Sequence, residues 1–173
     1  GPNGAGKTTV FNMITGIYPV TEGEIVVKGE KITNFPAHQV TQKGITRTFQ
    51  NIRLFSQMTV LDNVRLGRHC RTNTGLFGAL SRFSAARTEE KEISERSLEL
   101  LSMVGLSGKQ SETACNLAYG EQRRLEIARA LATDPTLLLL DEPAAGMNPQ
   151  ESKQLMELIG RLNESGLTIL LIE

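Results

Sequence analysis

The sequence predicts an α/β fold in which helices flank a mainly parallel sheet. Three observations carry this prediction. The chain opens with a glycine-rich stretch that runs directly into a helix-like segment, residues 1–14. A continuous apolar run at 137–140 has the length and character of a strand that is buried on both faces. Helix and strand patterns then alternate up to residue 173, which is the order that builds parallel sheets.

The opening residues, GPNGAGKTT, match G-x-x-x-x-G-K-[ST], a loop that wraps the phosphates of a nucleotide. Its glycines allow positive φ, so backbone N–H groups can turn inward onto an anion at the start of the next helix. We expect Lys7 to contact the β- and γ-phosphates and the hydroxyl of Thr8 to bind Mg²⁺. The competing interpretation is a glycine-rich turn before an ordinary helix. The predicted nucleotide contacts are Asn3, Gly4, Ala5, Gly6, Lys7, Thr8 and Thr9.

The charge balance argues against nucleic acid as the main partner. Lys and Arg together number 19 and so do Asp and Glu, which gives a formal net charge of zero and no global field. No apolar run approaches the roughly 20 residues that cross a bilayer. Cys70 and Cys115 lie far apart and follow no metal-ligand spacing, so we interpret them as reduced thiols of a cytosolic protein.

The first half of the chain alternates short strands with helices. Residues 24–32 predict a β-hairpin that turns near Gly29, and 44–50 predict a strand that ends on Gln50. A helical period begins at Val60, and a stronger helix runs from about residue 88 to Gly105. The stretch between these helices is rich in loop-forming residues but carries an apolar edge, whose role we leave open between local packing and a partner contact.

The second half returns to the α/β pattern. Residues 121–132 predict a helix with leucines on one face and arginines 123, 124 and 129 on the others. The strand at 137–140, a helix at 149–165 and a final strand at 168–173 follow. We therefore expect a nucleotide-binding core from residues 1–57 and 119–173, with a small antiparallel β region, and an inserted helical subdomain from residues 58–118.

Two carboxylates directly follow the apolar run. Asp141 stands where an acidic residue can hold Mg²⁺ opposite Thr8. Glu142, the next residue, would point in another direction and could orient or deprotonate the water that attacks the γ-phosphate. The alternative is a solvated acidic turn at the end of a strand.

A family resemblance rests on residues 117–124, LAYGEQRR, which lie upstream of LLLLDEP at 137–143. Together they resemble the signature motif and the Walker B strand of ABC ATPases, and Gln50 matches the Q-loop glutamine of that family. The resemblance covers nearly the whole chain and implies a P-loop NTPase of the ABC type that binds ATP and Mg²⁺ and hydrolyses ATP. It implies that Glu142, Lys7 and Gln50 act in catalysis and that Thr8, Gln50 and Asp141 surround the metal.

A finer pattern, made of RTFQNIRLF at 47–55, NLAYG at 116–120 and EPAAGMNP at 142–149, is similar to the ATP-binding subunits of branched-chain amino acid importers. The resemblance implies a peripheral subunit at the cytoplasmic face of the plasma or inner membrane. Its partners would be a second ATPase subunit in a homo- or heterodimer and transmembrane permease subunits, with a periplasmic or extracellular solute-binding protein acting indirectly. Gln50 would couple nucleotide binding to the helical subdomain and to a docked permease.

In such a dimer each ATP lies between the phosphate loop of one subunit and the signature helix of the other. The resemblance assigns this contact to Ala118, Tyr119, Gly120 and Glu121. Ala118 stands where the family commonly has serine and Tyr119 where it has glycine, so backbone donors would carry the contact. Ala145 and Asn148 likewise stand where serine and aspartate are common.

Two other functions remain as alternatives. One is a soluble ABC-type switch that acts on nucleic acid or a ribosome, against which the neutral charge weighs. The other is a P-loop kinase for a small molecule, which leaves the motif at 117–124 unexplained.

The chain also reads as a piece of a longer protein that is truncated at both ends. It starts on the first glycine of the loop, whereas such a loop follows a strand. The family's adenine-stacking aromatic residue would precede residue 1, and its switch histidine would follow Glu173. We expect residues 1–173 alone to be unstable or nearly inactive.

Overall fold

The computed structural model describes residues 5–48, 51–69 and 82–173. Its contacts divide the chain into two compact units. The first, called the α/β unit below, comprises Gly1–Asn51 and Asp134–Glu173, and the second, the helical unit, comprises Ile52–Thr133. The expected division differs from this one, because residues 119–133 cluster with the helices rather than with the core.

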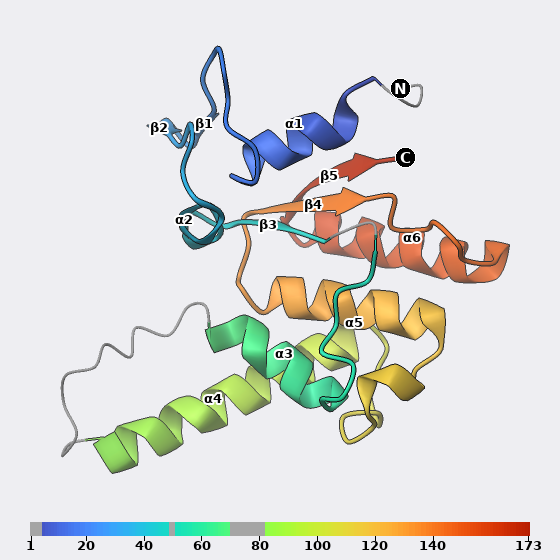
Figure 1. The fold of residues 1–173 in the computed structure, drawn as a ribbon. Coiled ribbons are helices and arrows are strands. Elements are labelled where there is room, and N and C mark those ends of the chain that lie inside the picture. Colours follow the sequence, from blue (N-terminus) through green and yellow to red (C-terminus); the bar gives the residue numbers. More distant parts are fainter. Residues whose placement is uncertain (1–4, 49–50, 70–81) are drawn as a thin grey trace. The chain divides into compact units, whose positions relative to one another are not determined.

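The α/β unit contains a parallel sheet with strand order β3-β4-β5, which confirms the predicted fold class. Ile45 pairs with Leu137 at one end of the sheet, and Asp141 pairs with Ile172 at the other. Figure 1 shows the elements, which are α1 (Lys7–Ile14), β1 (Val26–Val27), β2 (Glu30–Lys31), α2 (Ala37–Gln42), β3 (Ile45–Arg47), β4 (Leu137–Asp141), α6 (Pro149–Glu164) and β5 (Thr168–Ile172).

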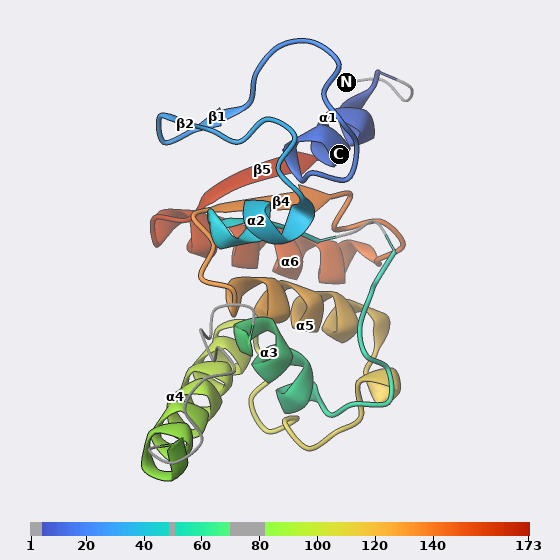
Figure 2. The same ribbon diagram turned by 60° about the vertical axis from the view of Figure 1, so that its left-hand side comes forward.

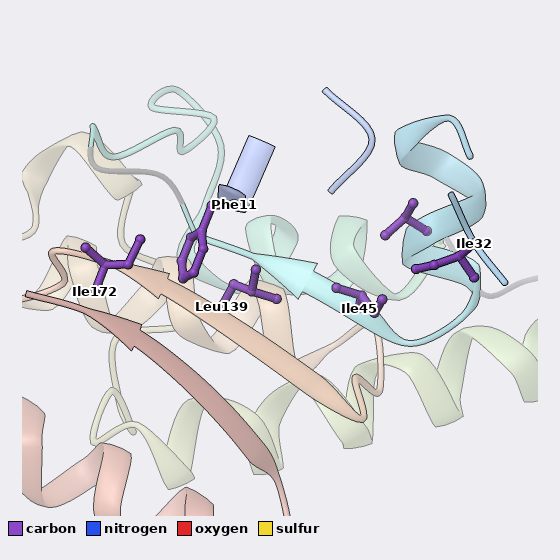
Figure 3. Packing of buried hydrophobic residues seen from close by; sticks show 6 residues of the cluster. Phe11, Ile32, Ile45, Leu139 and Ile172 are labelled. Carbon is purple, nitrogen blue, oxygen red and sulfur yellow. The ribbon is translucent and has the colours of Figure 1, made fainter. Parts of the chain in front are cut away.

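The leucine run forms the central strand because both faces of the sheet are covered. Leu138, Leu139 and Leu140 are fully buried, as expected for an inner parallel strand. Leu139 packs in a core cluster with Phe11, Ile45 and other apolar side chains (Figure 3). Successive side chains alternate between faces, so Leu138 and Leu140 point to the opposite side. Helices α1 and α6 lie on opposite faces of this sheet (Figures 1 and 2).

The hairpin is confirmed, although each of its strands has two residues. Lys28 (φ 51°) and Gly29 (φ 79°) form a turn with two left-handed residues, the geometry that matches the twist of a tight hairpin. Helix α2 was not predicted. It is six residues long and buries only Val40, so it offers no apolar period to detect.

The helical unit consists of α3 (Val60–His69), α4 (Arg82–Met103), the short 3₁₀ turn η1 (Ala114–Asn116) and α5 (Tyr119–Leu131). Helix α4 begins at Arg82 rather than near residue 88, and the added residues, RFSAAR, carry no apolar repeat at helical spacing that would mark them as helix. The approach of α3 to α5 is close at Gly67, where an added Cβ would lie 2.4 Å from the carbonyl oxygen of Arg129. Within the described ranges, no helix is both long and apolar enough to cross a bilayer.

One of the three arginines that the sequence places off the leucine face of α5 lies inside the unit. Arg123 is fully buried, and its Nη1 lies 2.8 Å from Oε2 of Glu126, which is also buried. Residues three apart lie on the same side of a helix, so this carboxylate can neutralise the arginine inside the unit.

Candidate nucleotide-binding site

The phosphate loop enters α1 through Gly6. Gly6 caps the helix in the left-handed region, at φ 78° and ψ 10°, which is the freedom that the motif requires of a glycine. No side chain caps this helix start and its first turn carries no acidic residue. Thr8 and Thr9 are exposed there. The helix start is therefore free of the carboxylate that would repel a phosphate; Asn3 and Gly4 lie outside the described residues.

Lys7 reaches the carboxyl end of the sheet. Its Nζ donates a hydrogen bond to the backbone oxygen of Glu173 at 2.9 Å. Glu173 follows Ile172, the residue that pairs with Asp141 across the parallel strands. The lysine of the phosphate loop and the two candidate carboxylates thus gather at the same end of the sheet, where ligands of open α/β sheets bind.

Asp141 is the last residue of β4 and only 3% exposed. Its Oδ2 lies 2.6 Å from Nη2 of Arg47, the last residue of the adjacent strand β3. Arg47 Nη1 donates to Oδ1 of Asn12 on α1 at 2.6 Å, and its guanidinium lies 5.3 Å from the centre of the Phe11 ring. A charged network therefore joins the phosphate helix to the two strands.

Glu142 has an unusual backbone conformation. Its φ is 43°, in the left-handed region that non-glycine residues occupy at a cost of about 1–2 kcal/mol. Its N–H donates to the oxygen of Ile172 at 2.9 Å and its oxygen accepts from the N–H of Ala145 at 3.1 Å, so the sheet and the following turn hold it. Such outliers cluster at functional sites. This left-handed residue ends the extended backbone of the strand that carries Asp141.

The donor atoms present suit Mg²⁺ bound together with a nucleotide. Asp141 and Thr8 offer a carboxylate and a hydroxyl, the hard oxygen ligands that this ion prefers. No group of three or more His, Cys, Asp or Glu side chains in the described parts of the chain could hold a metal alone. Mg²⁺ in nucleotide sites takes one or two protein ligands and completes its shell with phosphate and water. Gln50, the other expected ligand, lies outside the described residues.

The signature segment opens α5 in the helical unit. Ala118 is the N-cap and has no hydroxyl to offer, Tyr119 is exposed and Gly120 is buried. Glu121 Oε2 accepts from Nζ of Lys109 at 3.0 Å and from the Ala118 N–H at 3.2 Å, and the Glu121 N–H donates to the Ala118 oxygen. The carboxylate and the N–H of Glu121 are thus engaged within the unit.

The Lys109–Glu121 pair shifts both titrations. The hydrogen bond to Glu121 raises the pKa of Lys109 above its ordinary 10.5, against the effect of desolvation. Desolvation acts to raise the pKa of Glu121, but the hydrogen bonds from Lys109 and Ala118 outweigh it, and the pKa lies below its ordinary 4.5. The two groups stabilise each other's charged form. The glutamate at the start of the signature helix is therefore ionised, and its negative charge is balanced by the Lys109 ammonium.

The segment that follows Gln50 is tied to the helical unit. The fully buried Asn63 on α3 exchanges two hydrogen bonds with the backbone of Phe55, at 3.0 and 3.1 Å. Glu126 on α5 accepts from the N–H of Arg53 at 3.4 Å. Sequence reasoning missed the roles of Asn63, Glu126 and Arg47. The sequence placed Arg47 inside a predicted strand at 44–50, whereas β3 ends at Arg47, so nothing in the sequence put it at a strand end beside Asp141.

Both the sequence and the fold of this chain match known proteins. The sequence profile of the family described as ABC transporter matches residues 1–145. LivG of Escherichia coli (strain K12), a high-affinity branched-chain amino acid transport ATP-binding protein, is 48% identical over 174 residues, which cover 100% of this chain and 68% of LivG. The ADP conformation of MJ1267, an ATP-binding cassette of an ABC transporter, superposes with a TM-score of 0.82 at 32% identity, over 99% of this chain and 67% of that one.

A second solved structure, of the cassette MJ0796, is dimeric and bound to ADP and Pi in a post-hydrolysis state. It matches with a TM-score of 0.77 at 29% identity, over 98% of this chain and 70% of that one. The profile match spans most of the sequence and the fold agrees across its length, so this chain belongs to the ABC transporter family.

Proposed function

We propose that this chain is the ATP-hydrolysing subunit of an importer for branched-chain amino acids. The observation that carries the chemistry is the gathering of Lys7, Asp141 and Glu142 at one end of the parallel sheet. The solute is inferred from the 48% identity to LivG over the whole chain. The solute itself contacts other chains, so the substrate of this subunit is ATP.

Each candidate site residue of the α/β unit has a distinct role in ATP hydrolysis. The N–H groups at the start of α1 and the Lys7 ammonium hold the phosphates and stabilise the charge that develops on them. Thr8 and Asp141 hold Mg²⁺ with Gln50, and the metal when bound supplies charge neutralisation at the phosphate oxygens. Glu142 accepts the proton of the attacking water or orients it toward the γ-phosphate.

The subunit works as a dimer beneath a permease. The dimeric, ADP- and Pi-bound cassette among the similar structures supports a nucleotide held between two such chains. The start of α5 then faces the phosphates of the partner's nucleotide through backbone N–H groups. Transmembrane subunits dock on the cytoplasmic side, a solute-binding protein delivers the amino acid on the other side, and Gln50 together with the Phe55 segment transmits nucleotide binding to the helical unit.

The hydrolysis role is tested with Glu142→Gln in the complete protein. The amide keeps the size of the side chain but cannot accept the proton, so turnover is expected to fall by about 10² or more while ATP binding stays intact. Glu157→Gln, on the exposed face of α6, changes a carboxylate in the same way outside the site. It should turn over ATP as the unaltered protein does. Unchanged turnover in Glu142→Gln would remove Glu142 from its role.

The solute is tested by reconstituting the subunit with its permease in vesicles. ATP-dependent uptake of labelled leucine, isoleucine or valine is expected, and Glu142→Gln should abolish it. Uptake of none of the three, in vesicles whose ATPase is active, would contradict the assignment of the solute.

A further inference from the structure

A buried cation lies at the end of the sheet where the phosphate loop and the acidic pair meet. The Arg47 side chain is 5% exposed and that of Asp141 4%, with 2.6 Å between Nη2 and Oδ2. The second terminal nitrogen of the same guanidinium bonds Asn12, also at 2.6 Å. Three separate elements, α1, β3 and β4, are therefore joined through one side chain.

Stability alone is a poor reason for such a pair. Removing two charges from water costs several kcal/mol per ion, and apolar residues of the same volume often serve a core equally well. The positions around Arg47 are apolar enough for that, since Phe11 and Leu139 pack in the adjoining core. What the ion pair adds is direction, because a buried and bonded carboxylate cannot rotate freely.

Arginine is suited to fixing such a direction. Its guanidinium is planar, and its nitrogens donate along set directions, unlike the single ammonium of lysine. The Phe11 ring, 5.3 Å from the guanidinium carbon, lies against the group, and Asn12 holds its other arm. Arg47 thus links the position of Asp141 to α1, the helix that carries Lys7 and Thr8 in its first turn.

We propose that Arg47 is a positioning residue that orients the Asp141 carboxylate toward the Mg²⁺ of the bound nucleotide and fixes its distance from the phosphate helix. This inference rests on the proposed role of Asp141 at the metal. Groups that hydrogen-bond a metal-ligating carboxylate orient it, and their loss typically lowers metal affinity or activity by about 10–100-fold. In this role Arg47 acts through Asp141 rather than on the nucleotide.

The test measures metal dependence rather than turnover. Binding of a non-hydrolysable ATP analogue to the complete protein is titrated against Mg²⁺, for the unaltered protein and for Arg47→Met and Arg47→Lys. Both variants should raise the half-saturating Mg²⁺ concentration by about 10–100-fold. Nucleotide binding in the presence of EDTA should be unchanged, because Lys7 and the loop remain. Lysine should not rescue, since one ammonium cannot replace the two-armed contact.

Two further variants keep the test decisive. Arg123→Met removes a buried arginine of the same kind from the helical unit, where Arg123 pairs with Glu126, and should leave the Mg²⁺ dependence unaltered. Asn12→Ala removes only the second anchor of Arg47 and should raise the half-saturating Mg²⁺ concentration in the same direction by less. Asn12→Ala serves as the measurement if both Arg47 variants fail to fold.

The outcomes separate this inference from the proposed function. A half-saturating Mg²⁺ concentration that is unchanged or lower in the folded Arg47 variants overturns the positioning role, and so does an equal rise in Arg123→Met. Asp141→Asn is the reference. If it leaves the Mg²⁺ dependence unaltered, the metal role of Asp141 fails; if it raises the requirement while the Arg47 variants do not, only the role of Arg47 fails.

Discussion

Glu142 combines a strained backbone with the chemistry assigned to it. Its φ of 43° is a conformation in which a side chain costs about 1–2 kcal/mol, whereas glycine adopts it freely but loses about 0.5–1 kcal/mol through backbone entropy. The cost of the side chain and the entropy cost of glycine nearly cancel, or their difference favours glycine slightly. By these backbone terms glycine would suit the position at least as well, so a glutamate here is expected where function needs the carboxylate.

We therefore predict that Glu142→Gly separates stability from activity. The backbone terms alone should leave its free energy of unfolding equal to that of the unaltered protein or higher by up to about 1 kcal/mol, while ATP turnover falls by about 10² or more. Glu142→Val, with a β-branched side chain in the same conformation, should be the less stable variant. Denaturant unfolding monitored by circular dichroism gives both values. A loss well above 1 kcal/mol in the glycine variant would show that Glu142 is held by its side chain.

At the scale of elements, the contact between α3 and α5 depends on a missing side chain. A Cβ on Gly67 would meet the Arg129 carbonyl oxygen at 2.4 Å and the Cβ of Ala132 at 3.1 Å, and neither backbone can move without disturbing its helix. Gly67→Ala should therefore destabilise the protein by about 1–3 kcal/mol, as overpacking does. Gly160 on α6 is the matched control, because nothing lies within 4 Å of its would-be Cβ. Gly160→Ala should stabilise by about 0.5–1 kcal/mol. The stabilities of the two variants, which we expect to change in opposite directions, are measured by thermal or denaturant unfolding. Destabilisation by both substitutions would refute the packing explanation.

The start of α5 should respond to pH through its ion pair. The pKa of Glu121 is lowered in the fold, so its stabilisation is present above pH 4.5 and disappears as the pH falls below that value. The pKa of Lys109 is raised, so its share is present below pH 10.5 and is lost as the pH rises beyond it. Glu112 and Arg124 are the other charges that act on this pair.

Lys109→Met should consequently have a lower melting temperature than the unaltered protein between pH 4.5 and pH 10.5. On acidification its melting temperature should fall by less than that of the unaltered protein. The two proteins should converge as Glu121 becomes protonated below pH 4.5, because the bond that distinguishes them is then gone. Melting curves from pH 3 to pH 7 supply the comparison. A constant difference across that range would mean that lost packing of the lysine stem, and not the pair, is responsible.

At the scale of the whole molecule, the sequence predicted what local patterns encode. The β4 leucine run, the helix that Asn148 and Pro149 open, and the short hairpin were foreseen because apolar runs and turn residues act within a few positions. Arg47 and Asp141 lie 94 positions apart, and no local pattern reports their bond. The burial of Arg123 was missed for a related reason: a charge is interpreted as exposed until its partner is known.

Assembly provides the prediction that involves the complete molecule. If each ATP is held between two chains, a variant that binds ATP without hydrolysing it should accumulate as a dimer. Glu142→Gln with ATP and Mg²⁺ is expected to elute in size-exclusion chromatography with light scattering at twice the monomer mass. It should return to the monomer with ADP, which lacks the γ-phosphate that we propose the signature turn contacts. Glu157→Gln hydrolyses its ATP and should show the dimer only transiently. Because the α5 turn would contact the nucleotide through backbone N–H groups, adding Ala118→Ser to this variant should preserve the dimer. A Glu142→Gln protein that binds ATP but stays monomeric would contradict a nucleotide shared between chains.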